Sequence, residues 1–310
     1  MHHEREFYGH GKLLLLGEYF VLDGATALAV PTRRGQRFRV TPRPSDSAGT
    51  LEWTMEVAGD PSAHRRFAFT PDEWRAAPTD EDPVRHRLLQ LFHVAEQLLP
   101  GATRKLADTQ ITTTLEFDPA WGLGSSSTLV WFLSEWLGVN AYELLERTFG
   151  GSGYDLACAG AEGPLLYSRN GSRPTVTELD WRPEWLESTC FVYRNRKQNS
   201  REALQRYATI DIDVETIWEA GQMSRLFLQA PHLRAAARVA TAYERLIADE
   251  LGLTPVQEEH FRDFDGTVKS LGAWGGDFVW AISEAPLENT RAYFNERGYP
   301  TVIPYNDMVL

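Results

Sequence analysis

A glycine turn followed by three serines is the part of the sequence whose residue types point most directly to chemistry. It lies in residues 118–128, DPAWGLGSSST. Residues 111–117 before it alternate in hydrophobicity as a β-strand does, and apolar residues recur at helical spacing after it, at Leu129, Leu133 and Trp136. The serines are therefore expected at the N-terminus of a helix.

A helix N-terminus has unpaired backbone amides and the positive end of the helix dipole, so it attracts anions. The glycines let the backbone approach such an anion closely, and a serine hydroxyl can reach a phosphate oxygen. We expect a nucleoside triphosphate, ATP, to bind here. The predicted ATP-binding residues are Gly122, Leu123, Gly124, Ser125, Ser126 and Ser127. The alternative is a structural turn with a serine N-cap.

Two further segments contain glycines in a chemically suggestive order. In residues 9–32, GHGKLLLLGEYFVLDGATALAVPT, Lys12 precedes a short apolar strand, Gly17 and Glu18 end it, and residues 23–24 form a turn. In residues 268–282, VKSLGAWGGDFVWAI, a helical stretch is expected to end in a glycine-rich loop that leads into an apolar strand.

Together the three segments resemble the motifs of the GHMP kinases, the family of galactokinase, homoserine kinase, mevalonate kinase and phosphomevalonate kinase. The first resembles PGKxxLxGEY/HxVxxGxPAL and the second PxxxGLGSSAA. The third resembles KxxGAGxGG through Lys269, Gly272, Ala273, Gly275 and Gly276. The motifs occur in the family's order across nearly the whole chain. Three positions depart from the pattern: His10 replaces a proline, Ser127 an alanine, and Trp274 a small residue.

The resemblance implies an α+β, two-lobed GHMP kinase fold, with a ribosomal S5-like N-terminal lobe and a ferredoxin-like C-terminal lobe. The 310 residues suffice for two lobes. We expect an ATP-binding N-terminal domain at residues 1–175 and a C-terminal domain at residues 176–310, joined by a crossing within residues 168–183. Strands are expected at 190–194 and 301–304, and helices at 84–99, 142–149, 214–229, 233–251 and 287–297.

The catalytic residues are expected from residues 150–159, GGSGYDLACA. Mevalonate-kinase-like members have a matching SGxD segment that supplies a catalytic aspartate, which implies that role for Asp155. An aspartate is a weak base, so it would act mainly by positioning the acceptor hydroxyl. Lys12 would be its electrostatic partner and would neutralise charge on the transferred phosphoryl group. The alternatives are a helix N-cap for Asp155 and a solvated strand-end lysine.

Magnesium is expected with ATP, because phosphoryl transfer depends on neutralising the phosphate charge. The Ser126 hydroxyl is one candidate ligand. Related kinases add a glutamate from the helix before the SGxD turn, and Glu146 is the candidate here. Both Glu146 and Glu143 lie one or two residues out of ungapped register, so a solvated helix face is the alternative.

The acceptor is expected to meet residues 194–204, RNRKQNSREAL, which resemble the NTKxxRST-like segment of mevalonate-pathway kinases. Residues 199–200 are a credible helix start. Charge-assisted hydrogen bonds to a carboxylate or phosphate are expected there, although an exposed basic loop is the alternative. Glu18 could order the cleft or hold Lys12. The predicted substrate-binding residues are Glu18, Tyr154, Lys197, Ser200, Arg201, Gly272, Ala273, Gly275 and Gly276.

The resulting hypothesis is an ATP- and magnesium-dependent kinase of the mevalonate branch, with mevalonate as the first candidate acceptor and phosphomevalonate as the alternative. Homoserine, a sugar, or a non-catalytic sensor of ATP and a metabolite are further alternatives. The formal charge of −12 argues against a nucleic-acid partner. Two cysteines favour a reducing cytoplasm. The apolar run 13–22 is interrupted by Gly17 and Glu18, so no membrane association is expected. The sequence leaves open whether the protein forms a homodimer.

Overall fold

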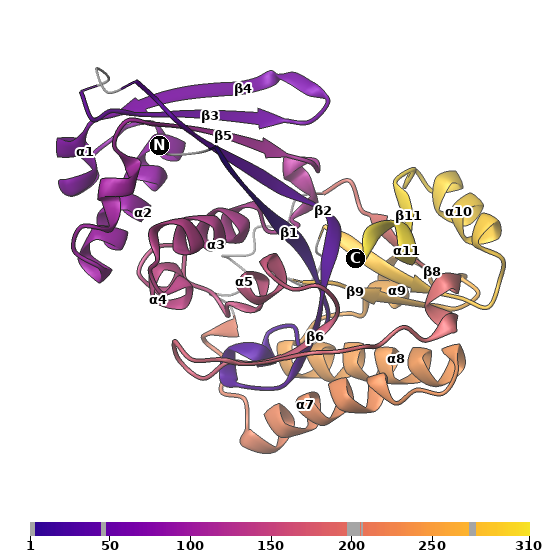
Figure 1. Cartoon of the computed structure of the whole chain (residues 1–310). Coiled ribbons are helices and arrows are strands. Elements are labelled where there is room, and N and C mark those ends of the chain that lie inside the picture. Colours follow the sequence, from indigo (N-terminus) through magenta and orange to yellow (C-terminus); the bar gives the residue numbers. More distant parts are fainter. Residues whose placement is uncertain (1–3, 45–47, 197–204, 206, 273–276) are drawn as a thin grey trace. The chain divides into compact units, whose positions relative to one another are not determined.

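The structure is a computed structural model that describes residues 4–44, 48–196, 205, 207–272 and 277–310. The chain forms two compact units (Figure 1). The first unit contains residues 1–11, 34–119 and 123–160, and the second contains residues 12–33, 120–122 and 161–310. The chain therefore passes between the units several times, whereas the expected domains meet once. The domain boundary at residue 175 stays a prediction.

The first unit contains a mixed sheet in the order β4 (Asp60–Phe69), β3 (Leu51–Val57), β5 (Thr109–Leu115) and β2 (Ala27–Pro42), and β1 (Arg5–Leu16) pairs with β2. Strands β3 and β5 are parallel, while β4 and β2 are antiparallel to their neighbours. Residues of β5 alternate between buried and half-buried, as expected for a strand with one face on a core.

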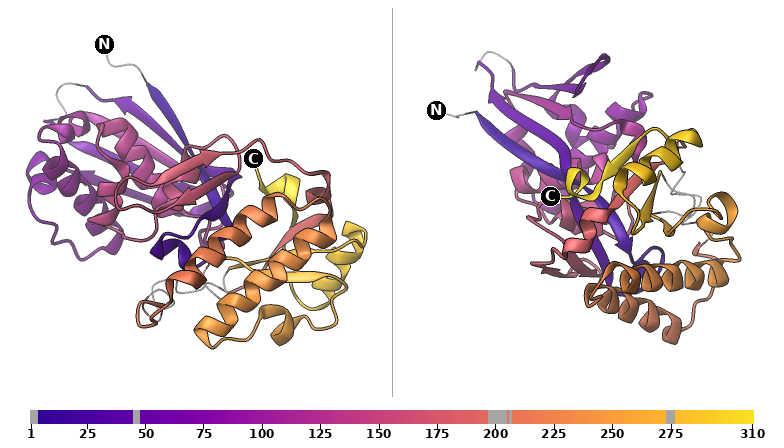
Figure 2. Two further views of the ribbon diagram at one scale, coloured as in Figure 1. Left: turned by 90° about the horizontal axis from the view of Figure 1, so that it is seen from below. Right: turned by 90° about the vertical axis from the view of Figure 1, so that its right-hand side faces the viewer.

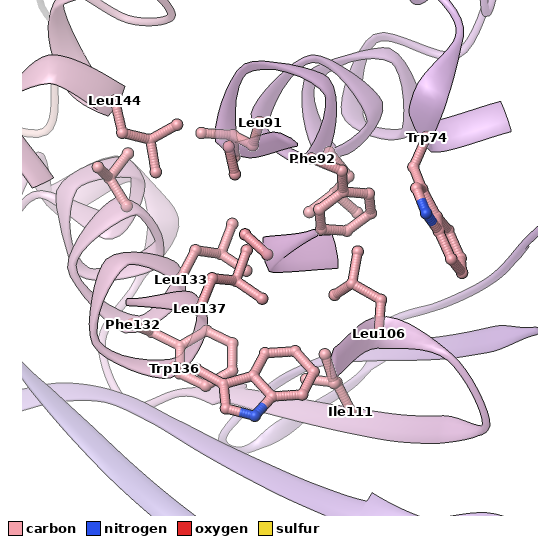
Figure 3. Close-up of a cluster of buried hydrophobic side chains, with 14 of the residues drawn as sticks. Trp74, Leu91, Phe92, Leu106, Ile111, Phe132, Leu133, Trp136, Leu137 and Leu144 are labelled. Atoms are coloured by element: carbon pink, nitrogen blue, oxygen red, sulfur yellow. The ribbon is translucent and has the colours of Figure 1, made fainter. Parts of the chain in front are cut away.

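Three helices cover the buried face of this sheet: α2 (Pro83–Leu98), α3 (Ser125–Leu137) and α4 (Ala141–Glu146). Figure 3 shows their leucines and aromatic rings pointing toward one another. Phe132 of α3 stacks on Phe38 of β2 with ring centroids 4.2 Å apart. Burying side chains of this size contributes about 1.5–3 kcal/mol each. The first turn of α3 is therefore held by a well-packed helix.

The second unit contains a four-stranded antiparallel sheet in the order β11 (Val302–Pro304), β8 (Thr189–Tyr193), β10 (Phe278–Ile282) and β9 (Thr267–Ser270). In the chain, helices α7 (Val214–Leu228) and α8 (Leu233–Leu251) lie between β8 and β9. Helix α10 (Leu287–Glu296) lies between β10 and β11. Figure 2 shows α7 and α8 side by side. This order and these crossings are ferredoxin-like, as expected.

All five residues of β10 are buried, so both faces of this sheet are covered. Val279 and Ala281 face a cluster that includes Phe261, Phe264 and Phe294. On the opposite face Trp280 stacks on Phe191 and contacts Phe227 of α7. The remaining strands of the unit are β6 (Leu165–Ser168), which pairs with the start of β2, and β7 (Thr175–Glu178), which pairs with β6.

Short elements complete the chain. They are the helices α1 (Pro71–Arg75), α5 (Tyr154–Ala159), α9 (Val256–His260) and α11 (Tyr305–Met308), and the 3-10 turns η1 (Phe20–Asp23), η2 (Ala102–Leu106), η3 (Pro119–Trp121) and η4 (Glu184–Ser188). The α+β fold class is confirmed, and so are the helices expected at 84–99, 142–149, 214–229, 233–251 and 287–297, with ends shifted by no more than a few residues. Within its described ranges the chain has no helix that is both long and apolar enough to span a membrane.

One secondary-structure expectation is wrong. The stretch before the third glycine loop is the strand β9 and not a helix. Its four residues are all buried, so they show no alternation, and a short buried run looks the same in either structure until its pairing with β10 is known. Residues 168–183, where the crossing between the lobes is expected, include the exposed edge strand β7.

Candidate active site

The three serines form the first turn of α3, as the glycine-serine motif predicted, and ATP binding at this turn stays a prediction. Gly124 is the N-cap, with φ 90°, a left-handed conformation that favours glycine. No side chain caps the helix, so the amides of the first turn are not satisfied by a cap hydrogen bond. Ser125 is exposed, Ser126 is half-buried, and Ser127 is 2% exposed. The turn can therefore present amides and hydroxyls to an anion.

Ser127 is oriented toward a second helix start. Its Oγ donates a hydrogen bond to Oδ2 of Asp155, in the first turn of α5. Gly153, with φ 87°, is the N-cap of α5, so the N-cap alternative for Asp155 is wrong. Leu156 of α5 is buried in the same core as α3, which fixes the two helix starts relative to each other. The structure thus brings the serine run and Asp155 together within the first unit.

The phenol of Tyr142 in α4 interacts electrostatically with this carboxylate. Burial raises the pKa of Tyr142 to about 12, and the negative charge of Asp155 adds to the effect. The phenol therefore stays neutral over the physiological pH range and does not compete with Asp155 as a base. Asp155 itself is only half-buried, so it remains accessible to a ligand.

Lys12 lies inside β1 and belongs to the second unit, where it is half-buried. The sequence suggested that it precedes the strand, whereas β1 begins seven residues earlier at Arg5. Its pairing with Asp155 of the first unit stays a prediction. Tyr154 is half-buried at the start of α5, and Glu146 is exposed at the end of α4.

Glu18 binds Lys269, a partner that the sequence did not suggest. Lys269 is 0% exposed and donates to Oε1 of Glu18, which is 2% exposed, and to the carbonyl oxygen of Ser270 at 2.8 Å. The pair joins the first glycine motif to the strand before the third. Burial raises the pKa of Glu18 to about 7, although the charge of Lys269 opposes the shift.

Two α8 side chains complete this buried cluster. The ring of Tyr243 lies 5.4 Å from Lys269 Nζ, in cation–π geometry. The carboxylate of Glu244 accepts hydrogen bonds from the backbone amides of Ser270 and Val256 at 3.2–3.3 Å. Burial raises the pKa values of both Tyr243 and Glu244. The cluster holds β9 to α8 and to Glu18, which follows β1, and so fixes the start of the third glycine segment.

Gly122 lies next to Asp277, which belongs to the same third glycine segment. It has φ 64°, and a Cβ atom at this position would overlap Oδ2 of Asp277, the residue before β10. Beside it, Trp121 contacts Phe278 edge to face, and the Tyr193 hydroxyl donates to the carbonyl oxygen of Ala120 at 3.4 Å. Within the second unit, the first glycine of the serine motif thus lies at the beginning of β10.

Several predicted residues lie outside the part of the chain that the structure describes. These are Lys197, Ser200, Arg201, Ala273, Gly275 and Gly276, together with Trp274 and the helix start expected at 199–200. Gly272 is described and has φ 69°. Among the described residues, no group of three His, Cys, Asp or Glu side chains is placed to hold a metal ion.

Sequence reasoning missed both hydrogen-bonded pairs. Ser127 and Asp155 lie 28 residues apart, and Glu18 and Lys269 lie 251 apart. Two features of the motifs could have drawn attention to these residues. Ser127 is a serine where the second motif usually has an alanine, and Lys269 is the first residue of the third motif. Neither signal names the partner.

Comparison with known proteins identifies the fold of the chain. No protein-family model matches the chain, and no curated protein matches it in sequence. Among solved structures, the Lin0012 protein from Listeria innocua is similar with a TM-score of 0.73 and 14% identity over 97% of both chains. Methanococcus jannaschii mevalonate kinase is similar with a TM-score of 0.64 and 15% identity, over 97% of this chain and 96% of that one.

A Streptococcus pneumoniae phosphomevalonate kinase, solved with phosphomevalonate and AMPPNP, is similar with a TM-score of 0.67 and 18% identity, over 93% of this chain and 96% of that one. At such identities the likeness concerns the fold and not the substrate. It agrees with the mixed sheet of the first unit and the ferredoxin-like sheet of the second. The chain has the α+β fold of the GHMP kinases.

Proposed function

We propose that the protein is an ATP-dependent small-molecule kinase that transfers the γ-phosphoryl group of ATP to a mevalonate-pathway acceptor, mevalonate first and phosphomevalonate as the alternative. The observation that carries the proposal is the hydrogen bond from Ser127 to Asp155 at the open start of α3. It sets a carboxylate beside a turn suited to phosphates. The kinases among the structural neighbours support the same reading.

The turn at residues 122–127 would bind the phosphates of ATP through backbone amides and serine hydroxyls. Asp155 has one carboxylate oxygen engaged by Ser127, which leaves the other to orient the acceptor hydroxyl and accept its proton. The acceptor oxygen then forms a bond to the γ-phosphorus as the bond to the β,γ-bridging oxygen breaks, and ADP leaves. Lys12 would offset the charge of the transferred group.

We propose that magnesium binds together with ATP. Mg²⁺ is usually bound through one or two protein oxygens and the substrate phosphates, so a dedicated cluster of side chains is not required. The half-buried Ser126 hydroxyl and the exposed Glu146 carboxylate are the proposed ligands. When bound, the ion would neutralise charge on the β- and γ-phosphates.

The test is acceptor-dependent ADP release with Mg-ATP, measured for mevalonate, 5-phosphomevalonate, homoserine and a panel of hexoses. Asp155→Asn keeps the shape of the side chain and removes its charge, so kcat should fall by about 10²–10⁴-fold. Asp72→Asn, an exposed carboxylate in α1, is the matched control and should retain wild-type turnover. ATP binding without ADP release for any acceptor would favour the non-catalytic sensor over the kinase.

A further inference from the structure

A polar pocket lies at the edge of the sheet in the second unit, where α8 and α9 both pack against β9 (Figure 1). Its volume is about 410 Å³, within the range of about 300–1,000 Å³ that is usual for pockets holding small molecules. Strand β9 is at the end of the strand order, so among the described strands its outer edge has no strand partner. The pocket therefore lies beside an open strand edge.

Side chains of the two helices, and not a further strand, satisfy this outer edge of β9. Gln257 of α9 donates from Nε2 to the carbonyl oxygen of Gly266 at 2.9 Å and accepts at Oε1 from the amide of Val268 at 3.0 Å. Glu244 of α8 accepts from the amide of Ser270 at 3.2 Å. All of these residues except Ser270 line the pocket. The hydrogen bonds therefore hold the walls of the pocket in fixed positions.

The pocket is distinct from the proposed phosphate-binding turn. Its lining residues Gly266 and Thr267 lie at the start of β9, where Thr267 pairs with Ile282 at the end of β10. Gly122 of the turn lies next to Asp277, which precedes β10. From Asp277 to Ile282 the strand rises roughly 17 Å, at about 3.4 Å per residue. The pocket and the turn are therefore at opposite ends of the same pair of strands.

Two arginines line the pocket, and no carboxylate of the described residues binds either of them closely. Nη2 of Arg245 in α8 is 3.9 Å from Oε1 of Glu258, which is too far for a hydrogen bond. Arg262 donates from Nε to the carbonyl oxygen of Glu258 and forms no ion pair within the described part of the chain. The carboxylate of Asp263 binds Arg297 instead. Both guanidinium groups thus lie near Glu258 and retain N–H donors for a ligand.

Two threonines add neutral hydrogen-bonding groups to the same pocket. The Oγ1 atoms of Thr241 in α8 and Thr267 in β9 are 3.2 Å apart. Whichever hydroxyl accepts this hydrogen bond keeps its own proton to donate. Arg245 lies one turn after Thr241 on the same face of α8. The pocket therefore combines cationic donors with a neutral hydroxyl donor.

We propose that this pocket binds a small organic dianion, either a dicarboxylate or a phosphate monoester. The guanidinium groups of Arg245 and Arg262 would bind its anionic oxygens through charge-assisted hydrogen bonds, and a threonine hydroxyl would bind an uncharged oxygen. Glu258 competes with the ligand for Arg245, but its side chain is 53% exposed and its ion pair is long, so its displacement costs little. This site goes beyond the proposed kinase function.

Isothermal titration calorimetry with disodium succinate and with glycerol 3-phosphate tests the site in the absence of ATP and acceptor. The wild type should bind at least one of the two saturably, compared with sodium chloride at equal ionic strength. Arg245→Met and Arg262→Met should each weaken this binding about tenfold or more, because each removes charge-assisted hydrogen bonds. Both arginines are exposed, so Tm without a probe should stay within about 2 °C of the wild type. Tighter binding of succinate assigns the site to dicarboxylates, and tighter binding of glycerol 3-phosphate assigns it to phosphate monoesters.

Matched variants separate this pocket from general effects of charge. Arg238→Met removes an exposed arginine of α8 that does not line the pocket, and it should bind the probe as tightly as the wild type. Glu258→Gln should strengthen binding about two- to fivefold, because the carboxylate no longer competes for Arg245. Glu259→Gln removes the next exposed carboxylate of α9 and should leave the affinity unchanged.

Two results would overturn the inference. One is that neither probe binds the wild type saturably in the millimolar range. The other is equal affinity of the wild type, Arg245→Met and Arg262→Met, because the probe would then bind elsewhere. The calorimetry does not involve phosphoryl transfer. A wild type that turns over no acceptor would therefore refute the proposed kinase function, while the titrations would still decide whether this anion site exists.

Discussion

The buried pair of Lys269 and Glu18 allows a quantitative test of how the second unit is held together. Lys269→Met replaces the cation with an apolar side chain of similar length and leaves the Glu18 carboxylate without its counter-charge. Both side chains are almost fully buried, at 0% and 2% exposure. Breaking a pair of this kind costs about 3–5 kcal/mol. For a unit of this size the expected fall in Tm is roughly 6–20 °C.

The loss of stability in Lys269→Met should depend on pH. Glu18 in the folded protein has a pKa of about 7, above its ordinary value of 4.5. A carboxyl with a raised pKa contributes stability that is complete below pH 4.5 and is lost as the pH rises through the folded value. Without Lys269 the pKa of Glu18 rises further, because desolvation is no longer opposed. The free energy of unfolding of Lys269→Met should therefore lie closer to that of the wild type at pH 5 than at pH 8.

Chemical denaturation at pH 5, 6.5 and 8 measures these differences for wild type, Lys269→Met, Glu18→Gln and the double variant. The double variant should recover much of the loss, because no unpaired charge remains. Arg245→Met, at an exposed cation of α8 that is 3.9 Å from Glu258, is the control and should cost less than about 1 kcal/mol. A loss below about 1 kcal/mol for Lys269→Met, or a strictly additive double variant, would refute the reasoning.

Three other expectations follow from the site. Ser127→Ala should lower kcat about tenfold and leave ATP affinity nearly unchanged, because it removes only the hydrogen bond that orients Asp155; Ser127→Thr should restore part of the rate, and a changed ATP affinity with full kcat would contradict this role. Gly122→Ala should weaken binding of a fluorescent ATP analogue, since the new Cβ would overlap Asp277 and the left-handed φ is strained; unchanged affinity would argue against this turn. Cys190 is buried, and burial raises its pKa to about 12, so it should react with a thiol reagent only after unfolding; rapid labelling of the native protein would contradict its burial.

The three glycine motifs and the alternating and helical hydrophobic patterns were sufficient to predict the α+β fold class and most of the helices. These features are local, because a strand, a helix start or a tight turn depends on residues within a few positions of one another. The serine run was predicted at a helix start on that basis, and the structure has it at the start of α3. Asp155 was singled out by the SGxD resemblance, and it lies in the first turn of α5.

Tertiary structure decided which of these local features meet. The sequence contains Glu18 and Lys269 but not their pairing, because a contact across 251 residues depends on how β1, α8 and β9 pack. The same packing made residues 267–270 a strand, since pairing with β10 outweighs local preference. It also buried Arg194 at the end of β8, where this residue is 5% exposed. A sequence specifies that an arginine is present, whereas only the folded chain determines whether water or a carboxylate can reach it.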